Sequence, residues 1–194
     1  MATAFDARLA IPTAYNGVTF RSRLEARWAV FFDMLGVPWL YEQEGHQLPS
    51  GWYLPDFLLP RADVWIELKP TDPTPQQVQK CRELCAATAR RVILAYGDFG
   101  SWLPGRSLQW PMSALCLSPS LDPDGEVVCF GEDSDYEPCE CPVCGEFSFE
   151  FEGRGARVCK GKRNCCGDSD RDHTSDSPRV CEAVDVADKW SFWK

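Results

Sequence analysis

Residues 52–69, WYLPDFLLPRADVWIELK, contain two strand-like runs joined by a short turn, and this arrangement decides the fold. The runs at 52–59 and 64–68 are rich in aromatic and branched apolar residues, and 60–63 supplies the turn. With the turn centred on residues 61 and 62, Asp56 lies opposite Glu67 in an antiparallel pair. Directly opposed side chains have Cβ atoms roughly 4.5–5.5 Å apart, so the register predicts two neighbouring carboxylates.

The same register gathers chemically active groups on one face of the two strands. Side chains alternate along a strand, so the apolar residues at 64, 66 and 68 suit the core, whereas Asp56, Glu67 and Lys69 share the opposite face. Two hard oxygen ligands with room for water describe a magnesium-type site. Lys69 can orient an attacking water or help to deprotonate it, and it can stabilise negative charge on a phosphate.

The flanking segments predict an α/β fold with a mixed sheet and helices packed on it. The expected elements are a hairpin at Asn16–Gly17, a helix over 22–35 capped by Ser22, strands over 37–42, 52–59 and 64–68, a helix over 75–88 capped by Thr74, and a strand over 91–96. The first strands follow one another as a meander, and the last strand joins through a helical crossover. Such a sheet has both antiparallel and parallel neighbours.

These residues resemble the PD-(D/E)xK nuclease superfamily, which has the restriction-endonuclease-like fold. The motif stands here as Pro55-Asp56, ten further residues, and Glu67-Leu68-Lys69. The order helix, three strands, helix, strand is also that of the family core. The segment FRSRLEARWAVFFDMLGVPWLYE at 20–42 is similar to small phage and bacterial members, and the resemblance covers roughly residues 13–98.

The resemblance implies hydrolysis of phosphodiester bonds with a divalent metal. Asp56 and Glu67 would hold Mg²⁺ or Mn²⁺ with the main-chain carbonyl of Leu68, and Lys69 would act on the hydrolytic water. Glu25 stands where many members add a glutamate from the first helix. Ser22 and Glu25 also form the sequence pattern of a capping box, in which the glutamate accepts from the amide of the cap residue.

Nucleic acid, with DNA favoured, is the expected partner, although the net charge of -9 excludes a general basic coat. A local patch must then make the contacts. Arg21 and Arg23 near the first helix are candidates, with a solvated face as the alternative. A second basic run has the same two interpretations, and its candidate contacts are Arg157, Lys160, Lys162 and Arg163.

The cysteines predict a second metal site, a structural zinc. The eleven cysteines cannot all be paired, and Cys141-Pro-Val-Cys144-Gly has the sequence of a zinc knuckle. Structural zinc takes four ligands, and we expect Cys159 and Cys166 to complete the set, with residues 145–158 as a hairpin between the two pairs. Alternative ligands are Cys165, Cys139 and His173, and an iron–sulfur cluster is the less favoured alternative. Cys81 and Cys85 occupy core-facing positions of the second helix.

Composition divides the chain into three parts. We expect a nuclease-like domain at 1–104, an acidic linker or extension at 105–136, and a cysteine-rich, zinc-ribbon-like domain at 137–194 that closes with a helix. No apolar run approaches the roughly 18 residues that a membrane helix needs. The N-terminus also lacks the pattern of a signal peptide. These features predict a cytoplasmic protein with no membrane partner.

The expected function is therefore that of a metal-dependent nuclease, either an endonuclease or an exonuclease, and a homodimer is compatible with the sequence. Two alternatives remain at this stage. One is a catalytically inactive nuclease fold that only binds nucleic acid. The other is an interaction or regulatory factor built around the zinc ribbon and the acidic stretch.

Overall fold

The structure is a computed structural model that describes residues 10–97, 99, 113–133, 136–141, 144–151 and 177–192. Its elements are β1 (Thr13–Tyr15), β2 (Val18–Phe20), α1 (Arg23–Met34), β3 (Leu40–Tyr41), β4 (His46–Leu48), β5 (Gly51–Tyr53), β6 (Phe57–Leu59), β7 (Val64–Lys69), α2 (Pro75–Thr88), β8 (Arg91–Tyr96), β9 (Ser113–Leu121), β10 (Val127–Asp133), β11 (Tyr136–Glu140), β12 (Phe147–Phe151) and α3 (Pro178–Lys189). Within these residues, no helix combines the length and apolar character that crossing a membrane requires.

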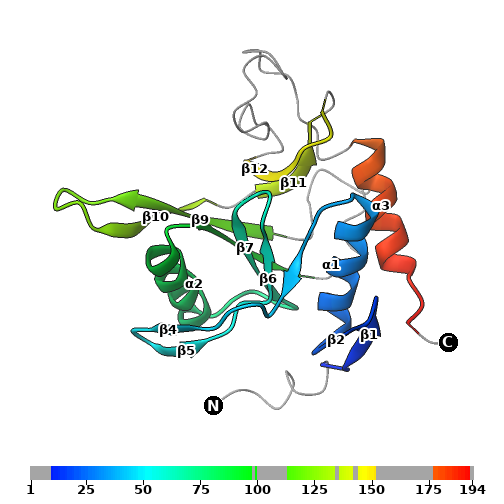
Figure 1. Ribbon diagram of the computed structural model, residues 1–194, viewed down its shortest axis with the longest axis horizontal. Coiled ribbons are helices and arrows are strands. Elements are labelled where there is room, and N and C mark those ends of the chain that lie inside the picture. The colour runs from blue at the N-terminus through cyan, green and yellow to red at the C-terminus, as the bar shows by residue number, and fades with distance from the viewer. Residues whose placement is uncertain are drawn as a thin grey trace.

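A six-stranded sheet in the order β10-β9-β8-β7-β6-β3 forms the centre of the molecule (Figure 1). β7 and β8 are parallel, and the other neighbouring pairs are antiparallel, so the expected mixed sheet is confirmed. α2 connects the two parallel strands, as the helical crossover required.

Local signals placed several elements correctly. Ser22 caps α1 and accepts a hydrogen bond from the main-chain N–H of Glu25, and Thr74 caps α2 in a capping box with Gln77. At the β1–β2 turn, Asn16 and Gly17 have φ values of 48° and 79°, the left-handed conformations that a two-residue hairpin turn needs.

The antiparallel pair β6–β7 has the predicted register. Phe57 pairs with Ile66 and Leu59 pairs with Val64, so Asp56 and Glu67 stand at the next position beyond the last paired residues. The run 52–59, in contrast, is not one strand. β5 pairs with β4, which was not predicted, and β6 begins only at Phe57. Pro55 lies between them and cannot donate to a strand ladder, which explains the break. The strand expected over 37–42 is reduced to β3.

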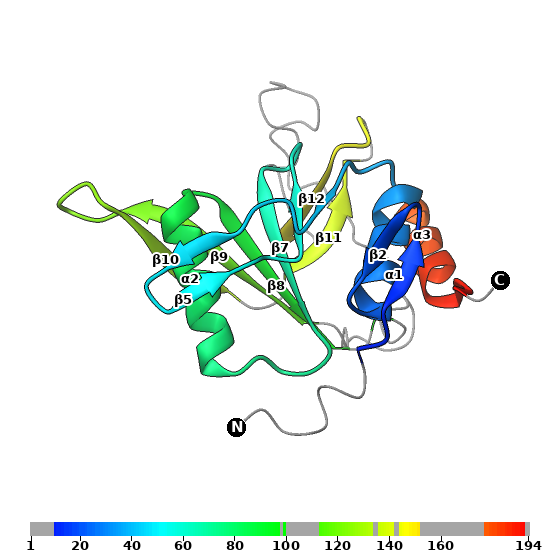
Figure 2. The same ribbon diagram turned by 60° about the horizontal axis from the view of Figure 1, so that its bottom comes forward.

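Both faces of β7 are buried, whereas the sequence assigned a core to one face only. Val64, Ile66 and Leu68 join a cluster that includes side chains of α1 and α3. On the other face, Trp65 packs with Leu84 and two thiols of α2, and the predicted core positions of Cys81 and Cys85 are confirmed. A parallel pair in the middle of a sheet typically has helices on both faces. In Figures 1 and 2, α1 and α3 lie side by side, and α2 lies over another part of the sheet.

The C-terminal half extends the same fold. Residues 113–133 lie in the stretch expected to be an acidic linker, but they form β9 and β10, which add to the sheet beside β8 and project as a long hairpin (Figure 1). Phe147 and Phe149 of β12 and the apolar side of α3 enter the core cluster of α1. The residues of 137–194 that the structure describes therefore share a core with the N-terminal part, where burial of their apolar side chains is favourable.

Only the first part of the expected hairpin at 145–158 is described, and it forms β12. β12 pairs antiparallel with β11, the strand that precedes the Cys141–Cys144 turn, with Glu140 opposite Phe147. The remainder of that expected hairpin, residues 152–158, lies outside the described residues.

Candidate active site

Three acids and a lysine meet at the C-terminal end of β7. Asp56 precedes β6, Glu67 and Lys69 belong to β7, and Glu25 lies in the first turn of α1. Their carboxylates are buried, with residue exposures of 2% for Asp56, 4% for Glu67 and 8% for Glu25. The charges of the other three groups all act on Asp56, so the structure brings together the four expected residues. The carboxyl end of parallel strands is also where open α/β sheets usually bind ligands.

Both oxygens of Asp56 have donors. Oδ2 accepts from the main-chain N–H of Leu68 at 2.8 Å, and Oδ1 accepts from Nη2 of Arg21 at 2.5 Å. Burial and the nearby charge of Glu67 nevertheless raise the pKa of Asp56 well above its ordinary value, while Lys69 opposes the change. The folded protein therefore holds the charged form of Asp56 at a cost, which a bound cation would offset.

Only one of the two carboxylate oxygens of Glu67 accepts a hydrogen bond from the described residues. Its Oε1 accepts from Nζ of Lys69 at 2.5 Å, whereas Oε2 is buried and has no hydrogen-bond partner among the described residues. Residues two apart on a strand share a face, so this contact follows from the alternation of β7. A buried carboxylate oxygen without a donor is unusual, and it is a suitable ligand for a hard cation.

Lys69 is held in its charged form. Burial alone would lower the pKa of Lys69, but the charges of Glu67 and Asp56 outweigh burial and raise it. The side chain is 23% exposed, so the ammonium lies between the buried acids and solvent. In this arrangement Lys69 can donate to an incoming oxygen atom, and it is not poised to accept a proton.

Glu25 is engaged at the start of α1. Its Oε2 accepts from the main-chain N–H of Arg21 at 3.0 Å and from Oη of Tyr41 at 2.5 Å, and its Oε1 accepts from Oγ of Ser22 at 2.8 Å. Ser22 caps the helix as expected, but Glu25 takes the amide of Arg21. Glu25 therefore contributes its charge to the site, and it could ligate a metal directly only by exchanging these hydrogen bonds.

Three further residues at the site were missed from sequence. Tyr53 of β5 has its hydroxyl 3.7 Å from Sγ of Cys81, and its pKa is raised by burial and by the charge of Glu67. Tyr41 of β3 binds Glu25, and Glu42 binds Nε of Arg21 at 2.7 Å. No local motif marks these residues, because each reaches the site through contacts between segments that are distant in the sequence.

An open pocket of about 470 Å³ lies beside the site. It is lined by Asn16, Val18, Asp33, Pro38, Trp39, Leu40, Tyr41 and Gln43. Tyr41 thus borders the pocket and also binds Glu25. Trp39 is held there by a hydrogen bond from its Nε1 to Asp33 at 2.8 Å. The acids themselves do not line this pocket, and Tyr41 is its connection to the site.

The two carboxylates of Asp56 and Glu67 fit a hard divalent cation. Within the described residues, no group of three His, Cys, Asp or Glu side chains is arranged to hold a metal. Main-chain or water oxygen would therefore complete the coordination. Mg²⁺ suits such a set, since it usually keeps several waters and binds through one or two carboxylates.

The first half of the expected zinc knuckle has the appropriate turn. The main-chain N–H of Cys144 points to Sγ of Cys141 at 3.5 Å, and Gly145 donates to the carbonyl of Cys141 at 2.8 Å with a φ of 68°. Cys139 is buried in β11. Cys159 and Cys166, with the alternatives Cys165 and His173, lie outside the described residues.

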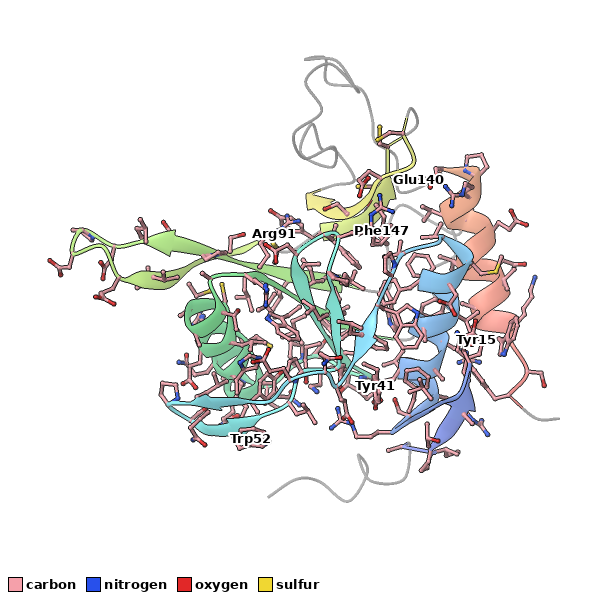
Figure 3. All side chains as sticks on the ribbon, in the orientation of Figure 1. Tyr15, Tyr41, Trp52, Arg91, Glu140 and Phe147 are labelled. Atoms are coloured by element: carbon pink, nitrogen blue, oxygen red, sulfur yellow. The ribbon has the colours of Figure 1, made fainter. Side chains whose placement is uncertain are left out.

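The knuckle lies far from the acidic cluster. Arg61, in the turn that precedes β7, binds Glu146 at 2.9 Å, and Arg91 at the start of β8 binds Ser148 at 3.1 Å. The knuckle is thus attached to the N-terminal ends of the two parallel strands, and the acids lie at the C-terminal end of β7. In Figure 3, Glu140 and Phe147 lie toward one end of the molecule and Tyr41 toward the other.

Of the expected nucleic-acid contacts, the structure describes only the two arginines near the first helix. Arg21 lies in the acidic site, and Arg23 is half-buried in the first turn of α1. The four residues of the second basic run, Arg157, Lys160, Lys162 and Arg163, lie outside the described residues.

Comparison with protein-family models, with curated proteins and with solved structures found no match for the chain. The resemblance to PD-(D/E)xK nucleases therefore stays a prediction.

Proposed function

We propose that the protein is a divalent-metal-dependent nuclease whose ion is held by Asp56 and Glu67. The observation that carries the proposal is the buried Oε2 of Glu67, which has no donor among the described residues. A buried polar atom left without a partner costs about 1–3 kcal/mol, and more when it is charged. Because Asp56 stands beside it with a raised pKa, one cation would satisfy both carboxylates.

The residues of the chain have distinct tasks in this proposal. Asp56 and Glu67 bind the ion, helped by the main-chain carbonyl of Leu68. Lys69 keeps its proton and uses it to orient water or to stabilise charge that develops on the phosphate. When bound, Mg²⁺ or Mn²⁺ supplies polarisation of the phosphodiester and lowers the pKa of water.

The arrangement of elements supports a restriction-endonuclease-like core. In its support, α1, the hairpin β6–β7, the crossover helix α2 and the parallel strand β8 follow one another in the order expected for that core, and Asp56 and Glu67 flank the end of the β6–β7 pairing. DNA is the favoured substrate, a cytoplasmic location is the favoured compartment, and association of two copies is compatible with the proposal.

We also propose a structural zinc held by Cys141, Cys144, Cys159 and Cys166. The N–H···S contact in the Cys141–Cys144 turn supports it, since backbone amides directed at sulfur stabilise thiolates. An iron–sulfur cluster is the less favoured alternative. The distance of this turn from the acids makes its role one of stability or of grip on nucleic acid.

The experiment uses the full chain with labelled single- and double-stranded DNA and RNA, with and without Mg²⁺ or Mn²⁺. Asp56→Asn and Glu67→Gln keep the shape of each side chain and remove its charge. We expect metal-dependent cleavage by the wild type and a loss of at least about 100-fold in both variants, within the range typical of catalytic groups.

Glu182→Gln is the matched control, because Glu182 is an exposed carboxylate of α3. It should cleave like the wild type. Wild-type activity in Asp56→Asn or Glu67→Gln would contradict the assignment. Nucleic-acid binding without cleavage, unaffected by metal, would instead identify an inactive nuclease fold.

A further inference from the structure

The guanidinium of Arg21 binds the oxygen of Asp56 that the main-chain N–H of Leu68 leaves available. Its Nη2 is 2.5 Å from Oδ1 of Asp56, and its Nε is 2.7 Å from Oε1 of Glu42. The other oxygen of Asp56 accepts from the N–H of Leu68. A cation that approaches Asp56 from solvent therefore meets Arg21 first.

The ion pair joins the exposed side chain of Arg21 to the buried side chain of Asp56. The side chain of Arg21 is 54% exposed, whereas that of Asp56 is 3% exposed. The backbone of Arg21 is fixed separately, because its N–H lies 3.0 Å from Oε2 of Glu25 and 3.0 Å from Oη of Tyr41. The side chain can therefore move without disturbing the start of α1. Because the Asp56 carboxylate is buried, losing Arg21 alone would be costly, and the guanidinium can leave only in exchange for another cation.

Glu42 is the second ion-pair partner of Arg21. Its carboxylate is 25% exposed, and its main-chain N–H donates to the carbonyl of Asp56 at 2.9 Å, which fixes it beside the site. If Arg21 releases Asp56, Glu42 can retain the guanidinium at the edge of the site. Arg21 then presents donors toward solvent, and the guanidinium fork matches a phosphate.

The charges of the site are unbalanced without a metal. The site holds four carboxylates and two cationic side chains: Glu25, Glu42 and Asp56 act on Arg21, and Asp56 and Glu67 act on Lys69. One divalent ion would offset this excess of negative charge while both basic residues remain nearby. The ion and the guanidinium cannot share Oδ1 of Asp56, because two cations at that separation repel each other.

We propose that Arg21 is the resident counter-ion of the metal-free site, that a divalent metal displaces it from Asp56, and that the displaced guanidinium, retained by Glu42, binds a phosphate of the substrate. This inference rests on the proposed function. It makes Arg21 a positioning and substrate-binding residue whose availability depends on the metal.

The test measures metal binding and nucleic-acid binding separately. Mn²⁺ is titrated calorimetrically into the metal-free site of the full chain for the wild type, Arg21→Gln and Arg21→Lys. Binding of a DNA duplex is then measured with Ca²⁺ in place of Mg²⁺. Because Arg21 competes with the ion, we expect Arg21→Gln to bind Mn²⁺ about tenfold more tightly than the wild type and DNA about tenfold more weakly. The affinities of Arg21→Lys should lie between those of the wild type and Arg21→Gln.

Arg90→Gln is the control, because Arg90 also belongs to an exposed ion pair, with Asp63 at 2.8 Å, beside the turn that precedes β7. It should bind Mn²⁺ like the wild type. A purely structural role for Arg21 would weaken both kinds of binding together, and unchanged or weaker Mn²⁺ binding by Arg21→Gln overturns the inference. If Arg21→Gln folds poorly, Arg21→Lys replaces it in the test, because it keeps a positive charge. Its Mn²⁺ binding should then be tighter than that of the wild type.

Glu67→Gln separates this result from failure of the proposed function. If the wild type binds Mn²⁺ and Glu67→Gln does not, the metal site stands and only the role of Arg21 is in question. If both bind equally, or if neither binds, the metal site itself is wrong, and the role of Arg21 falls with it.

Discussion

The side chain of Asp56 accepts a hydrogen bond from the main-chain N–H of Leu68, at 2.8 Å. This bond lies just beyond the last residue pair of the β6–β7 hairpin, Phe57 with Ile66. A carboxylate therefore takes the place of the main chain as partner of β7. The bond ties Asp56 to the strand that carries Glu67, and it makes Asp56 part of the fold as well as of the candidate site.

The first prediction concerns this double role. Asp56→Ala leaves the buried N–H of Leu68 without an acceptor, whereas Asp56→Asn retains a side-chain oxygen for it. We expect the alanine variant to be about 1–3 kcal/mol less stable than the asparagine variant, the usual cost of an unpaired buried donor. Urea unfolding followed by circular dichroism measures the difference. Equal stabilities would show that the hydrogen bond to Leu68 contributes nothing.

The second prediction concerns pH. Burial and the charge of Glu67 raise the pKa of Asp56 in the folded protein, so between its ordinary and its raised value the folded chain binds more protons than the unfolded chain. The free energy of unfolding of the protein, measured without a divalent metal at the site, must then fall as pH rises through that interval and level off above it. Urea unfolding at a series of pH values, with no Mg²⁺ or Mn²⁺ added, follows this change.

Asp56→Asn is the matched variant for the pH series. It lacks the titrating group, so the difference in stability between it and the wild type should grow as pH rises from about 4, the ordinary pKa of an aspartate. Groups remote from the site titrate alike in both proteins and cancel in that difference, and Lys69, whose pKa Asp56 helps to raise, titrates far above this range. A difference that stays constant with pH would contradict the raised pKa of Asp56.

The third prediction concerns Glu25. Its oxygens accept from Arg21, Ser22 and Tyr41, so it would act on the proposed metal through its charge and its neighbours. We expect Glu25→Gln to weaken Mn²⁺ binding by about 10- to 100-fold, as is typical for groups that surround a metal ligand. Glu67→Gln should abolish binding in the same calorimetric measurement. A loss in Glu25→Gln as complete as that in Glu67→Gln would make Glu25 a direct ligand.

The fourth prediction concerns the zinc knuckle. Cys141→Ser and Cys144→Ser should each reduce the zinc content of the purified protein and lower its stability by on the order of 4 kcal/mol or more, the scale on which loss of a metal acts. Because the turn is attached at the far end of β7, cleavage per folded molecule should persist. Elemental analysis and thermal unfolding provide the measurements.

Cys181→Ser is the control for the knuckle, since Cys181 lies in α3, outside the expected ligand set. It should keep its zinc. Unchanged zinc in Cys141→Ser and Cys144→Ser would remove these two residues from the site, and iron in place of zinc would indicate the cluster alternative.

Sequence reasoning succeeded where the signal is local. The caps Ser22 and Thr74, the Asn16–Gly17 turn and the continuous apolar run at 91–96 each act over a few residues, and each element formed as expected. The β6–β7 register was also readable, because a short turn leaves little freedom in how its two strands align. Both acids of the motif follow from that register.

Sequence reasoning failed where two segments must find each other over a long separation. β9 and β10 carry acidic and turn-forming residues that resemble a linker, yet they complete the sheet through pairing with β8. The contact of β12 and α3 with the core of α1 depends on shape and burial across more than a hundred residues, and no local pattern records it.

The helices, the β6–β7 pairing and the approach of Asp56 to Glu67 follow from local patterns, because hydrogen bonds between near neighbours and the alternation of strands govern these features. The surroundings of the three acids follow from the folded chain: Arg21 binds Asp56, Tyr41 binds Glu25, and Glu67 keeps a buried oxygen that has no donor among the described residues. These contacts arise from the way α1 and the β3 segment pack against the hairpin. Their electrostatic effect depends on distance and burial, which are properties of the folded chain alone.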